Sequence, residues 1–208
     1  MKNKPSIDYV HVVEIGKNHG PNYGKPGDMG NIKTTYNGIN YRSRLEAKWA
    51  YMFDAFHWKF QYEPFDLNGW IPDFVLFGAR EEILVEVKPI SRLIYFNFIK
   101  LEDALKGSEH FGKDILILGT KPEGIKIGWL FEGGYGIEED DSSLLPGYAE
   151  GDGLINKFGG VFGLIHDHQS YRDRITGLHD GDHCVDVANS DEIDFIWKQA
   201  CNTVQWCR

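Results

Sequence analysis

Two acidic residues, with twelve residues between them, make the first candidate site in the sequence. Asp73 lies in one apolar stretch, and Glu86 opens the tripeptide Glu86-Val87-Lys88 in the next. Side chains alternate across a strand, so we expect Glu86 and Lys88 on one face of the second stretch and Val87 on the other. The connection at residues 78–80 is short enough for a hairpin that brings Asp73 beside Glu86.

The expected closeness of Asp73 and Glu86 calls for a cation, because two carboxylates side by side repel each other. A hard divalent ion such as Mg²⁺ meets this need, since it prefers oxygen ligands and keeps several of its waters. We therefore predict a metal site made of Asp73, Glu86 and the backbone carbonyl of Val87. Lys88 would lie next to this site, where an ammonium can orient or help to deprotonate a water, or stabilise a phosphorane-like charge.

An amphipathic helix is predicted ahead of the two acidic residues, over Ser43–Lys59. Its apolar residues recur at spacings of three and four, which is the pattern of a helix with one buried face. Ser43 and Glu46 fit a capping box at the start of this helix. The residues of the apolar face are Leu45, Trp49, Met52, Phe53 and Phe56.

Three strands, a second helix and two further strands are predicted after this first helix. Runs of β-branched and aromatic residues bounded by Gly, Pro and Asn indicate the strands. This mixed order is typical of an α/β sheet with helices on its faces. The segments are the strands Phe60–Phe65, Trp70–Phe77 and Glu82–Lys88, the helix Leu93–Lys106, and the strands Asp114–Gly119 and Ile125–Phe131.

These elements and motifs resemble the PD-(D/E)xK nuclease superfamily over residues 41–131. The motifs are YRSRLEAKWA on the first helix, IPDF on the second predicted strand and VEVKP on the third. The first motif is particularly similar to small phage and bacterial members, which have an R-S-x-L-E-A-x-W-A helix. The resemblance implies a restriction-endonuclease-like core of order αβββαβ, with a mixed central sheet flanked by helices, followed here by a C-terminal extension.

The resemblance also implies a role for each residue of the site. Asp73 and Glu86 would be direct metal ligands, Glu46 would complete the metal site, and Lys88 would act on the attacking water. The implied reaction is Mg²⁺-dependent hydrolysis of DNA phosphodiesters to 5′-phosphate and 3′-hydroxyl ends, with Mn²⁺ able to substitute. A simpler reading of Glu46 is a capping-box glutamate, and the two roles are compatible.

Basic residues near the first helix are candidates for contacts with DNA phosphates. Arg42 and Arg44 flank the start of the helix, and an ordinary solvated helix start is the alternative for both. Lys33 and Lys48 are weaker candidates of the same kind. The net charge of −9 does not exclude a polyanion, because the acidic excess lies in residues 107–208.

A histidine-rich segment near the C-terminus is a second candidate site. The spacing of its residues could place zinc ligands in pairs. Two features argue against a structural zinc. The segment lacks a CxxC motif, and it contains four acidic residues. The candidate ligands are His166, His168, His179, His183 and Cys184.

The nuclease core is expected to be one of four parts of the chain. A helix is predicted over Asp191–Trp206, with Ser190 and Asp194 as a weak capping pair. The predicted parts are an N-terminal arm and loop at 1–40, the nuclease core at 41–131, an acidic flexible loop at 132–153, and a histidine-rich segment with a helix at 154–208.

Composition narrows the class of protein. A chain of 208 residues suits one domain with an appendage, and its three cysteines are too few for a disulfide framework of the secreted kind. No apolar run approaches the roughly 20 residues of a membrane-spanning helix, and the N-terminus has no signal-peptide pattern. The expected location is the cytoplasm of a bacterium or a phage-infected cell.

Three functions are compatible with these features. The first is a DNA endonuclease acting in phage or bacterial DNA metabolism. The second is a catalytically inactive DNA-binding or assembly protein that keeps the nuclease fold, and the third is a regulator whose acidic half binds a basic partner. The joint presence of Asp73, Glu86 and Lys88 favours the nuclease. The sequence leaves open the DNA specificity, the number of metals, and whether the protein is a homodimer.

Overall fold

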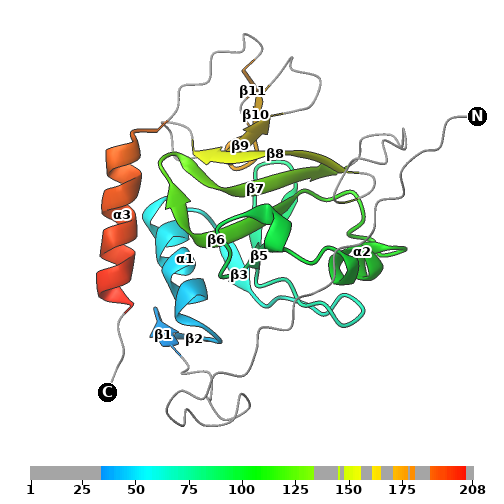
Figure 1. The fold of residues 1–208 in the computed structure, drawn as a ribbon, viewed down its shortest axis with the longest axis horizontal. Coiled ribbons are helices and arrows are strands. Elements are labelled where there is room, and N and C mark those ends of the chain that lie inside the picture. The colour runs from blue at the N-terminus through cyan, green and yellow to red at the C-terminus, as the bar shows by residue number, and fades with distance from the viewer. Residues whose placement is uncertain are drawn as a thin grey trace, which may run out of the picture. The chain divides into compact units, whose positions relative to one another are not determined.

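A mixed β-sheet organises the part of the chain that the computed structural model describes (Figure 1). The described residues are 34–133, 145, 148–155, 161–164, 171–177, 179–180 and 188–204. The strands of the sheet are β3 (Phe60–Tyr62), β4 (Phe74–Phe77), β5 (Glu82–Val87), β6 (Ile115–Glu123), β7 (Lys126–Gly133), β8 (Tyr148–Ile155), β9 (Val161–Leu164), β10 (Tyr171–Asp173) and β11 (His179–Asp180). Within the described residues, their order across the sheet is β11-β10-β9-β8-β7-β6-β5-β4-β3.

One pair of neighbouring strands is parallel and the other described pairs are antiparallel. Strands β5 and β6 are the parallel pair, with Val85 opposite Leu116. Parallel neighbours need a crossover connection, and here it carries two short helices. The helices of the described chain are α1 (Arg44–Ala55), the 3₁₀ helix η1 (Leu93–Tyr95), α2 (Ile99–Leu105) and α3 (Ser190–Thr203).

The order of elements in the central part of the chain confirms the predicted helix, three strands, helix and two strands. The elements are α1, β3, β4, β5, α2, β6 and β7. The fold is therefore α/β, with a mixed sheet flanked by helices, as predicted. None of the described helices is both long and apolar enough to cross a membrane.

Helix α1 is fixed at both ends and buried along one face. The Ser43 hydroxyl oxygen accepts a hydrogen bond from the backbone N–H of Glu46 at 3.1 Å, which confirms Ser43 as the N-cap. The helix ends at Ala55 rather than at the predicted Lys59, because His57 adopts a left-handed conformation with φ 58°. The residues of α1 in the core are Ala47, Trp49, Ala50, Met52 and Phe53.

Trp49 joins α1 to two other elements. Its indole N–H donates to the carbonyl of Gly119 in β6 at 2.9 Å. Its ring centroid lies 4.7 Å from that of Trp197 in α3. Figure 1 shows the result, with α1 and α3 side by side and α2 on the other side of β5 and β6.

The two faces of the sheet contribute to different apolar clusters. Phe74 and Val85 belong to the cluster that includes α1. Val75 and Leu84, their neighbours in sequence, belong to the cluster that includes Leu101 of α2. This alternation is the period-2 pattern of strands buried on both faces.

The predicted acidic loop at 132–153 is wrong over its first two residues, which end strand β7, and over its last six, which begin strand β8. Strand β8 pairs antiparallel with β7, with Glu150 opposite Phe131. Its Gly153 approaches the next strands so closely that a Cβ there would lie 2.8 Å from a side-chain carbon of Leu116. A glycine-rich acidic composition therefore reflects close strand packing here, while residues 134–144 lie outside the described residues.

The predicted N-terminal arm also needs correction, because residues 34–41 form a two-stranded hairpin of β1 (Thr34–Tyr36) and β2 (Ile39–Tyr41). Asn37 and Gly38 make its turn, with φ values of 48° and 78°. An Asn-Gly dipeptide between short strands is the usual signal for such a turn, and it was missed. The Tyr36 hydroxyl donates to Asp54 at 2.9 Å, which ties the hairpin to α1.

The ends of other predicted elements shift for local reasons. The predicted helix Leu93–Lys106 is divided into η1 and α2, and the Asn97 side chain accepts from the N–H of Ile99 at the start of α2. The predicted capping pair of the last helix is wrong, because Asn189 is the N-cap of α3 and accepts from the N–H of Asp191. The strand predicted over Phe60–Phe65 ends at Tyr62, and the strand predicted over Trp70–Phe77 begins at Phe74.

A buried ionic cluster joins the start of β6 to the turn after β10. Asp114 accepts from the Arg174 Nε at 2.9 Å and from the N–H of Gly133 at 3.1 Å. A second nitrogen of Arg174, Nη2, lies 3.2 Å from a carboxylate oxygen of Glu132. Since these charged groups are buried, each depends on its partners to offset lost hydration.

This cluster predicts a sharp difference between two neighbouring substitutions. We expect Asp114→Ala to lower the free energy of unfolding by about 3–5 kcal/mol, because it leaves the Arg174 guanidinium buried with fewer partners. Lys113→Ala, which removes a partly exposed ion pair with Glu82, should cost under about 1 kcal/mol. Urea unfolding followed by tryptophan fluorescence measures both values, and equal losses would contradict the interpretation.

Candidate functional site

The structure brings Asp73 and Glu86 together on neighbouring strands. Phe74 lies opposite Val85 in the antiparallel β4–β5 pair. Continued by one residue along both strands, the same register places Asp73 opposite Glu86. Both carboxylates are buried. By strand alternation both belong to the sheet face that α2 covers.

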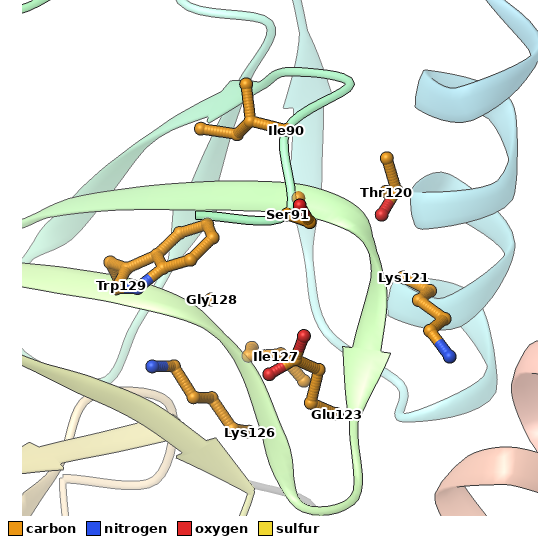
Figure 2. Close-up of a pocket in the computed structure, with 10 residues that line it drawn as sticks. Ile90, Ser91, Thr120, Lys121, Glu123, Lys126, Ile127, Gly128 and Trp129 are labelled. Carbon is orange, nitrogen blue, oxygen red and sulfur yellow. The ribbon is translucent and has the colours of Figure 1, made fainter. Parts of the chain in front are cut away.

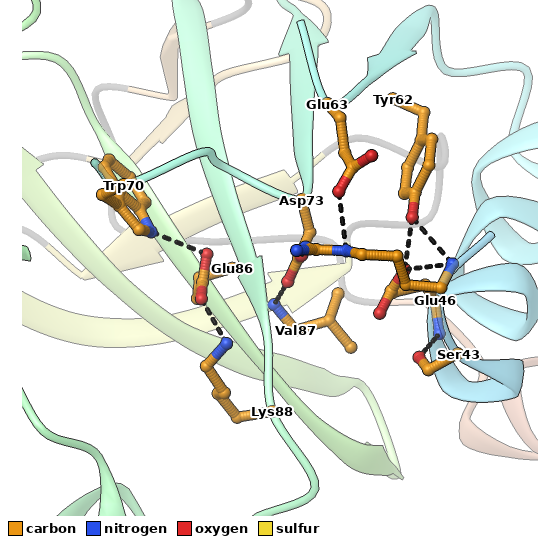
Figure 3. Close-up of polar contacts among 10 residues, drawn as sticks. Ser43, Glu46, Tyr62, Glu63, Trp70, Asp73, Glu86, Val87 and Lys88 are labelled. Atoms are coloured by element: carbon orange, nitrogen blue, oxygen red, sulfur yellow. Dashed lines mark hydrogen bonds and ion pairs between the residues drawn. The ribbon is translucent and has the colours of Figure 1, made fainter. Parts of the chain in front are cut away.

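The Asp73 carboxylate receives one backbone and one side-chain donor. Figure 3 shows the backbone donor, the N–H of Val87. Its Oδ2 accepts from the N–H of Val87 at 2.7 Å, and its Oδ1 accepts from Nη2 of Arg42 at 2.5 Å. Burial, followed by the adjacent carboxylate of Glu86, raises the pKa of Asp73 to about 7, although Val87 and Lys88 act in the opposite direction. Full ionisation of Asp73 at neutral pH therefore depends on nearby positive charge.

The Glu86 carboxylate lies between an indole and an ammonium group. Its Oε2 accepts from the indole N–H of Trp70 at 2.9 Å. Its Oε1 forms an ion pair with Nζ of Lys88. The buried indole fixes one oxygen, while the Lys88 side chain is partly exposed and leads from Glu86 toward solvent.

Glu46 reaches the same region from α1. Its Oε2 accepts from the Tyr62 hydroxyl at 2.6 Å and from the N–H of Arg42 at 3.1 Å. The Glu46 carboxylate therefore accepts from the N–H of Arg42, the residue before the N-cap Ser43, rather than from the N–H of Ser43 itself. Burial, and then the bond to Glu46, raise the pKa of Tyr62 above its ordinary value, so this phenol remains a donor.

Arg42 connects the start of α1 to the carboxylates. Its Nη2 contacts Asp73, and its Nε lies 2.6 Å from a carboxylate oxygen of Glu63. Burial lowers the pKa of Arg42, but Asp73, Tyr62 and Glu63 outweigh this effect and raise it overall. Arg42 is therefore a permanent cation at the carboxylate pair, and its contact with DNA stays a prediction.

The other predicted DNA-binding residues lie in different places. Arg44 is exposed at the first position of α1. The Lys48 ammonium lies 5.9 Å from the centroid of the Trp197 ring, on the side of α1 that meets α3. Lys33 lies outside the described residues.

The zinc candidates fall mainly in the part of the chain that is not described. His166, His168, His183 and Cys184 lie outside the described residues. The backbone of His179 belongs to β11, where it pairs with Arg172 of β10. The prediction about zinc therefore stays a prediction.

The donor set of the carboxylate pair fits a hard divalent cation. Asp73 and Glu86 offer oxygen atoms from two adjacent buried side chains, and the charge of Glu46 on α1 acts on Asp73. Their charges are currently balanced by Arg42 and Lys88. Among the residues that the structure describes, no group of three or more His, Cys, Asp or Glu has the arrangement of a ready-made metal site.

Sequence reasoning missed the residues that hold these carboxylates in place. Trp70 follows a tight turn at Asn68 and Gly69, whose φ values are 51° and 90°. Backbone hydrogen bonds of 2.7 and 2.9 Å between Leu67 and Trp70 close this turn. The Asn-Gly dipeptide was visible in the sequence, but the pairing of Trp70 with Glu86 depends on the tertiary fold.

Two recesses lie near the ends of β5. A pocket of about 10 Å³ lies past its last residue, lined by Ile90, Gly119 and Trp129 among others (Figure 2). That volume holds about one water, so it is no substrate pocket. A recess of about 630 Å³ lies at the other end, where Glu82 and His110 line it.

Comparisons with protein-family models, with curated proteins and with solved structures found no match for this chain. The chemistry of the site therefore rests on its own residues. Those residues are two buried carboxylates, a third from α1, and two cations that contact them.

The bond between Trp70 and Glu86 can be tested with a double-mutant cycle. Trp70→Phe keeps the ring but removes the N–H donor, and Glu86→Gln removes the charge. Because the Gln amide oxygen can still accept from the indole, the cycle measures the charge-dependent part of the bond. We expect a coupling free energy of about 1–1.5 kcal/mol.

The matched control combines Trp70→Phe with Glu63→Gln, because Glu63 pairs with Arg42 instead. This second cycle should give a coupling below about 0.5 kcal/mol. Urea unfolding of the six proteins supplies all the values. Equal coupling in the two cycles would remove the indole from the account of Glu86.

Proposed function

We propose that this protein is a divalent-metal-dependent DNA endonuclease of the PD-(D/E)xK type. The observation that carries the proposal is the buried pair Asp73 and Glu86, with the Lys88 ammonium against Glu86. The order of α1, β3, β4, β5, α2 and β6, which matches the αβββαβ core of that superfamily, supports it. The motifs around Glu46 and Asp73 support it independently.

Asp73, Glu86 and Glu46 would hold Mg²⁺ or Mn²⁺, with the Val87 carbonyl as a further ligand. When bound, the ion supplies Lewis acidity toward a phosphoryl oxygen and charge neutralisation for the leaving oxygen. The backbone N–H of Val87 already orients Asp73. Because Trp70 holds one oxygen of Glu86, the other remains oriented toward Lys88.

The chain's own groups divide the remaining work. Lys88 would orient the attacking water and stabilise the negative charge that develops on the phosphoryl group, since its ammonium is partly exposed beside Glu86. The water would release its proton to solvent, and the leaving 3′-oxygen would take one up from solvent. Arg42 would bind a phosphate oxygen of the substrate, because its guanidinium is half exposed while it reaches Asp73. The water oxygen forms a bond to phosphorus as the bond from phosphorus to the 3′-oxygen breaks, which leaves 5′-phosphate and 3′-hydroxyl ends.

The proposed substrate is consistent with the charge distribution. The site lies in residues 1–106, which carry 14 basic and 13 acidic side chains, whereas residues 107–208 carry 8 basic and 18 acidic side chains. A catalytically inactive DNA-binding or assembly protein would need neither the buried acid pair nor the Lys88 contact. The nuclease explains both features with one reaction.

The direct test is cleavage of supercoiled plasmid, linear duplex and a four-way junction, each with Mg²⁺ or EDTA. We expect metal-dependent cutting of at least one substrate. Lys88→Ala should lower the rate by about 10²–10³-fold, because it removes the ammonium that orients the water and stabilises the developing charge. Lys198→Ala, an exposed substitution on α3, is the control and should keep the native rate.

Cutting that continues in EDTA, or an unchanged rate in Lys88→Ala, would contradict the proposed mechanism. Gel electrophoresis of end-labelled products identifies the 5′-phosphate and the 3′-hydroxyl. The preferred substrate would also define which structural form of DNA the protein cuts.

Metal binding provides a second prediction that does not depend on cleavage. The Arg42 guanidinium and a divalent ion compete for the same carboxylate of Asp73. We therefore expect Arg42→Ala to bind Mn²⁺ up to about tenfold more tightly than the native protein. Its affinity for DNA should fall, because a phosphate contact is lost.

Isothermal titration calorimetry measures the affinity for Mn²⁺, and Asp73→Asn serves as the variant that should lose binding. Glu63→Gln, which frees Arg42 from its second partner only, should change the affinity little. Weaker Mn²⁺ binding by Arg42→Ala would show that Arg42 organises the carboxylates instead of competing for them.

A further inference from the structure

The connection between Lys88 and α2 carries an exposed apolar tip. Ile94 and Tyr95, in η1, have exposed fractions of 73% and 64%. Ile99 at the start of α2 is also strongly exposed. Clusters of large exposed apolar side chains often mark interaction surfaces.

The exposure of this tip does not come from a loose segment. Leu93 and Phe96, on either side of the tip, pack against the cluster on the α2 face of the sheet. The N–H of Phe96 donates to the carbonyl of Leu93 at 2.8 Å. The Phe98 ring lies 4.6 Å from Phe96 and 5.2 Å from Phe131 of β7, between centroids. Ile94 and Tyr95 are thus presented outward by an anchored turn.

The base of the tip is fixed next to the candidate site. The N–H of Ile90 donates to the carbonyl of Lys88 at 2.7 Å, and the carbonyl of Ile90 accepts from the N–H of Thr120 at 3.0 Å. Figure 2 shows Ile90 close to the β6 segment that carries Thr120. Since Leu93 packs on the face to which Asp73 and Glu86 belong, the tip and the carboxylates share one side of the sheet.

Charge indicates which class of partner the tip would meet. Residues 89–101 contain two basic residues, Arg92 and Lys100, and no acidic residue. Both basic residues are exposed, and the stretch between them is apolar apart from Asn97. An apolar centre between two cations complements a nucleic acid, in which stacked bases lie between two phosphate backbones.

We propose that Ile94 and Tyr95 form a wedge that inserts between adjacent bases of the DNA, beside the phosphodiester to be cut. This inference rests on the proposed nuclease function and names its preferred substrate. Inserting a wedge requires two bases to unstack, which is easiest at a mismatch, a branch or a flexible step. The Tyr95 ring would replace part of the lost stacking, and Arg92 and Lys100 would hold the flanking phosphates.

The test uses the full chain with Lys88→Ala, so that bound DNA stays uncut in Mg²⁺. The probe is a duplex with 2-aminopurine beside a single mismatch, because this base becomes more fluorescent when it unstacks. We expect binding to raise the fluorescence. Adding Ile94→Ser and Tyr95→Ser should abolish the rise and weaken binding about tenfold, which corresponds to the loss of about one stacking contact.

The control for removing exposed apolar surface is Phe195→Ser on α3, where the exposed fraction is 60%. This variant should keep both the fluorescence rise and the affinity. Circular dichroism and sedimentation velocity on every variant report folding and self-association. The tip residues are exposed, so their substitution should leave the thermal midpoint within the range of the control.

The outcomes separate the wedge from the nuclease. DNA cutting by the native protein without any fluorescence rise in the Lys88→Ala background would overturn the wedge and leave the proposed function standing. Failure of the native protein to bind or cut any DNA would overturn both. A tip variant that keeps the fluorescence rise but changes from dimer to monomer would assign the tip to a second copy of the chain, and overturn the wedge.

Discussion

The constraint on which this structure depends is the electrostatic cost of two carboxylates that lie side by side inside a sheet. Asp73 and Glu86 are buried on adjacent strands, where water cannot screen their repulsion. Two cations from different segments offset this repulsion, Arg42 before α1 and Lys88 after β5. The position of α1 is therefore linked to the charge of the sheet, because Arg42 must reach Asp73.

The elements around this pair act as supports that limit its movement. Trp49 bonds α1 to the carbonyl of Gly119 in β6, which sets the distance from the helix to the strands. Trp70, after a tight turn, donates a hydrogen bond to Glu86 of the pair, and Tyr62 of β3 donates one to Glu46 of α1. At the other end of the strands, the cluster of Asp114 and Arg174 holds the sheet together with buried charges of its own. Buried side chains therefore hold the carboxylates of the site in place, as a site of fixed geometry requires.

Local patterns in the sequence predicted much of the central fold. The spacing of Trp49, Met52 and Phe53 predicted the buried face of α1, and Ser43 predicted its first turn, because both signals act within a few residues. The closeness of Asp73 and Glu86 followed from strand alternation and a short hairpin. The sequence predicts a loop over most of strand β8, because glycine and acidic residues have low strand propensity and only the pairing with β7 offsets this.

The sequence by itself therefore determined which residues could do chemistry and which strands carry them, since those signals are short in range. Only the tertiary structure decided their partners. Trp70 and Glu86 are in contact although they are 16 residues apart in the sequence, and Arg42 and Asp73 are 31 residues apart. No local pattern specifies such contacts, because they depend on how α1, the turn before β4 and the sheet pack together. The outward position of Ile94 and Tyr95 has the same origin, since the burial of Leu93 and Phe96 on the sheet leaves these two side chains exposed.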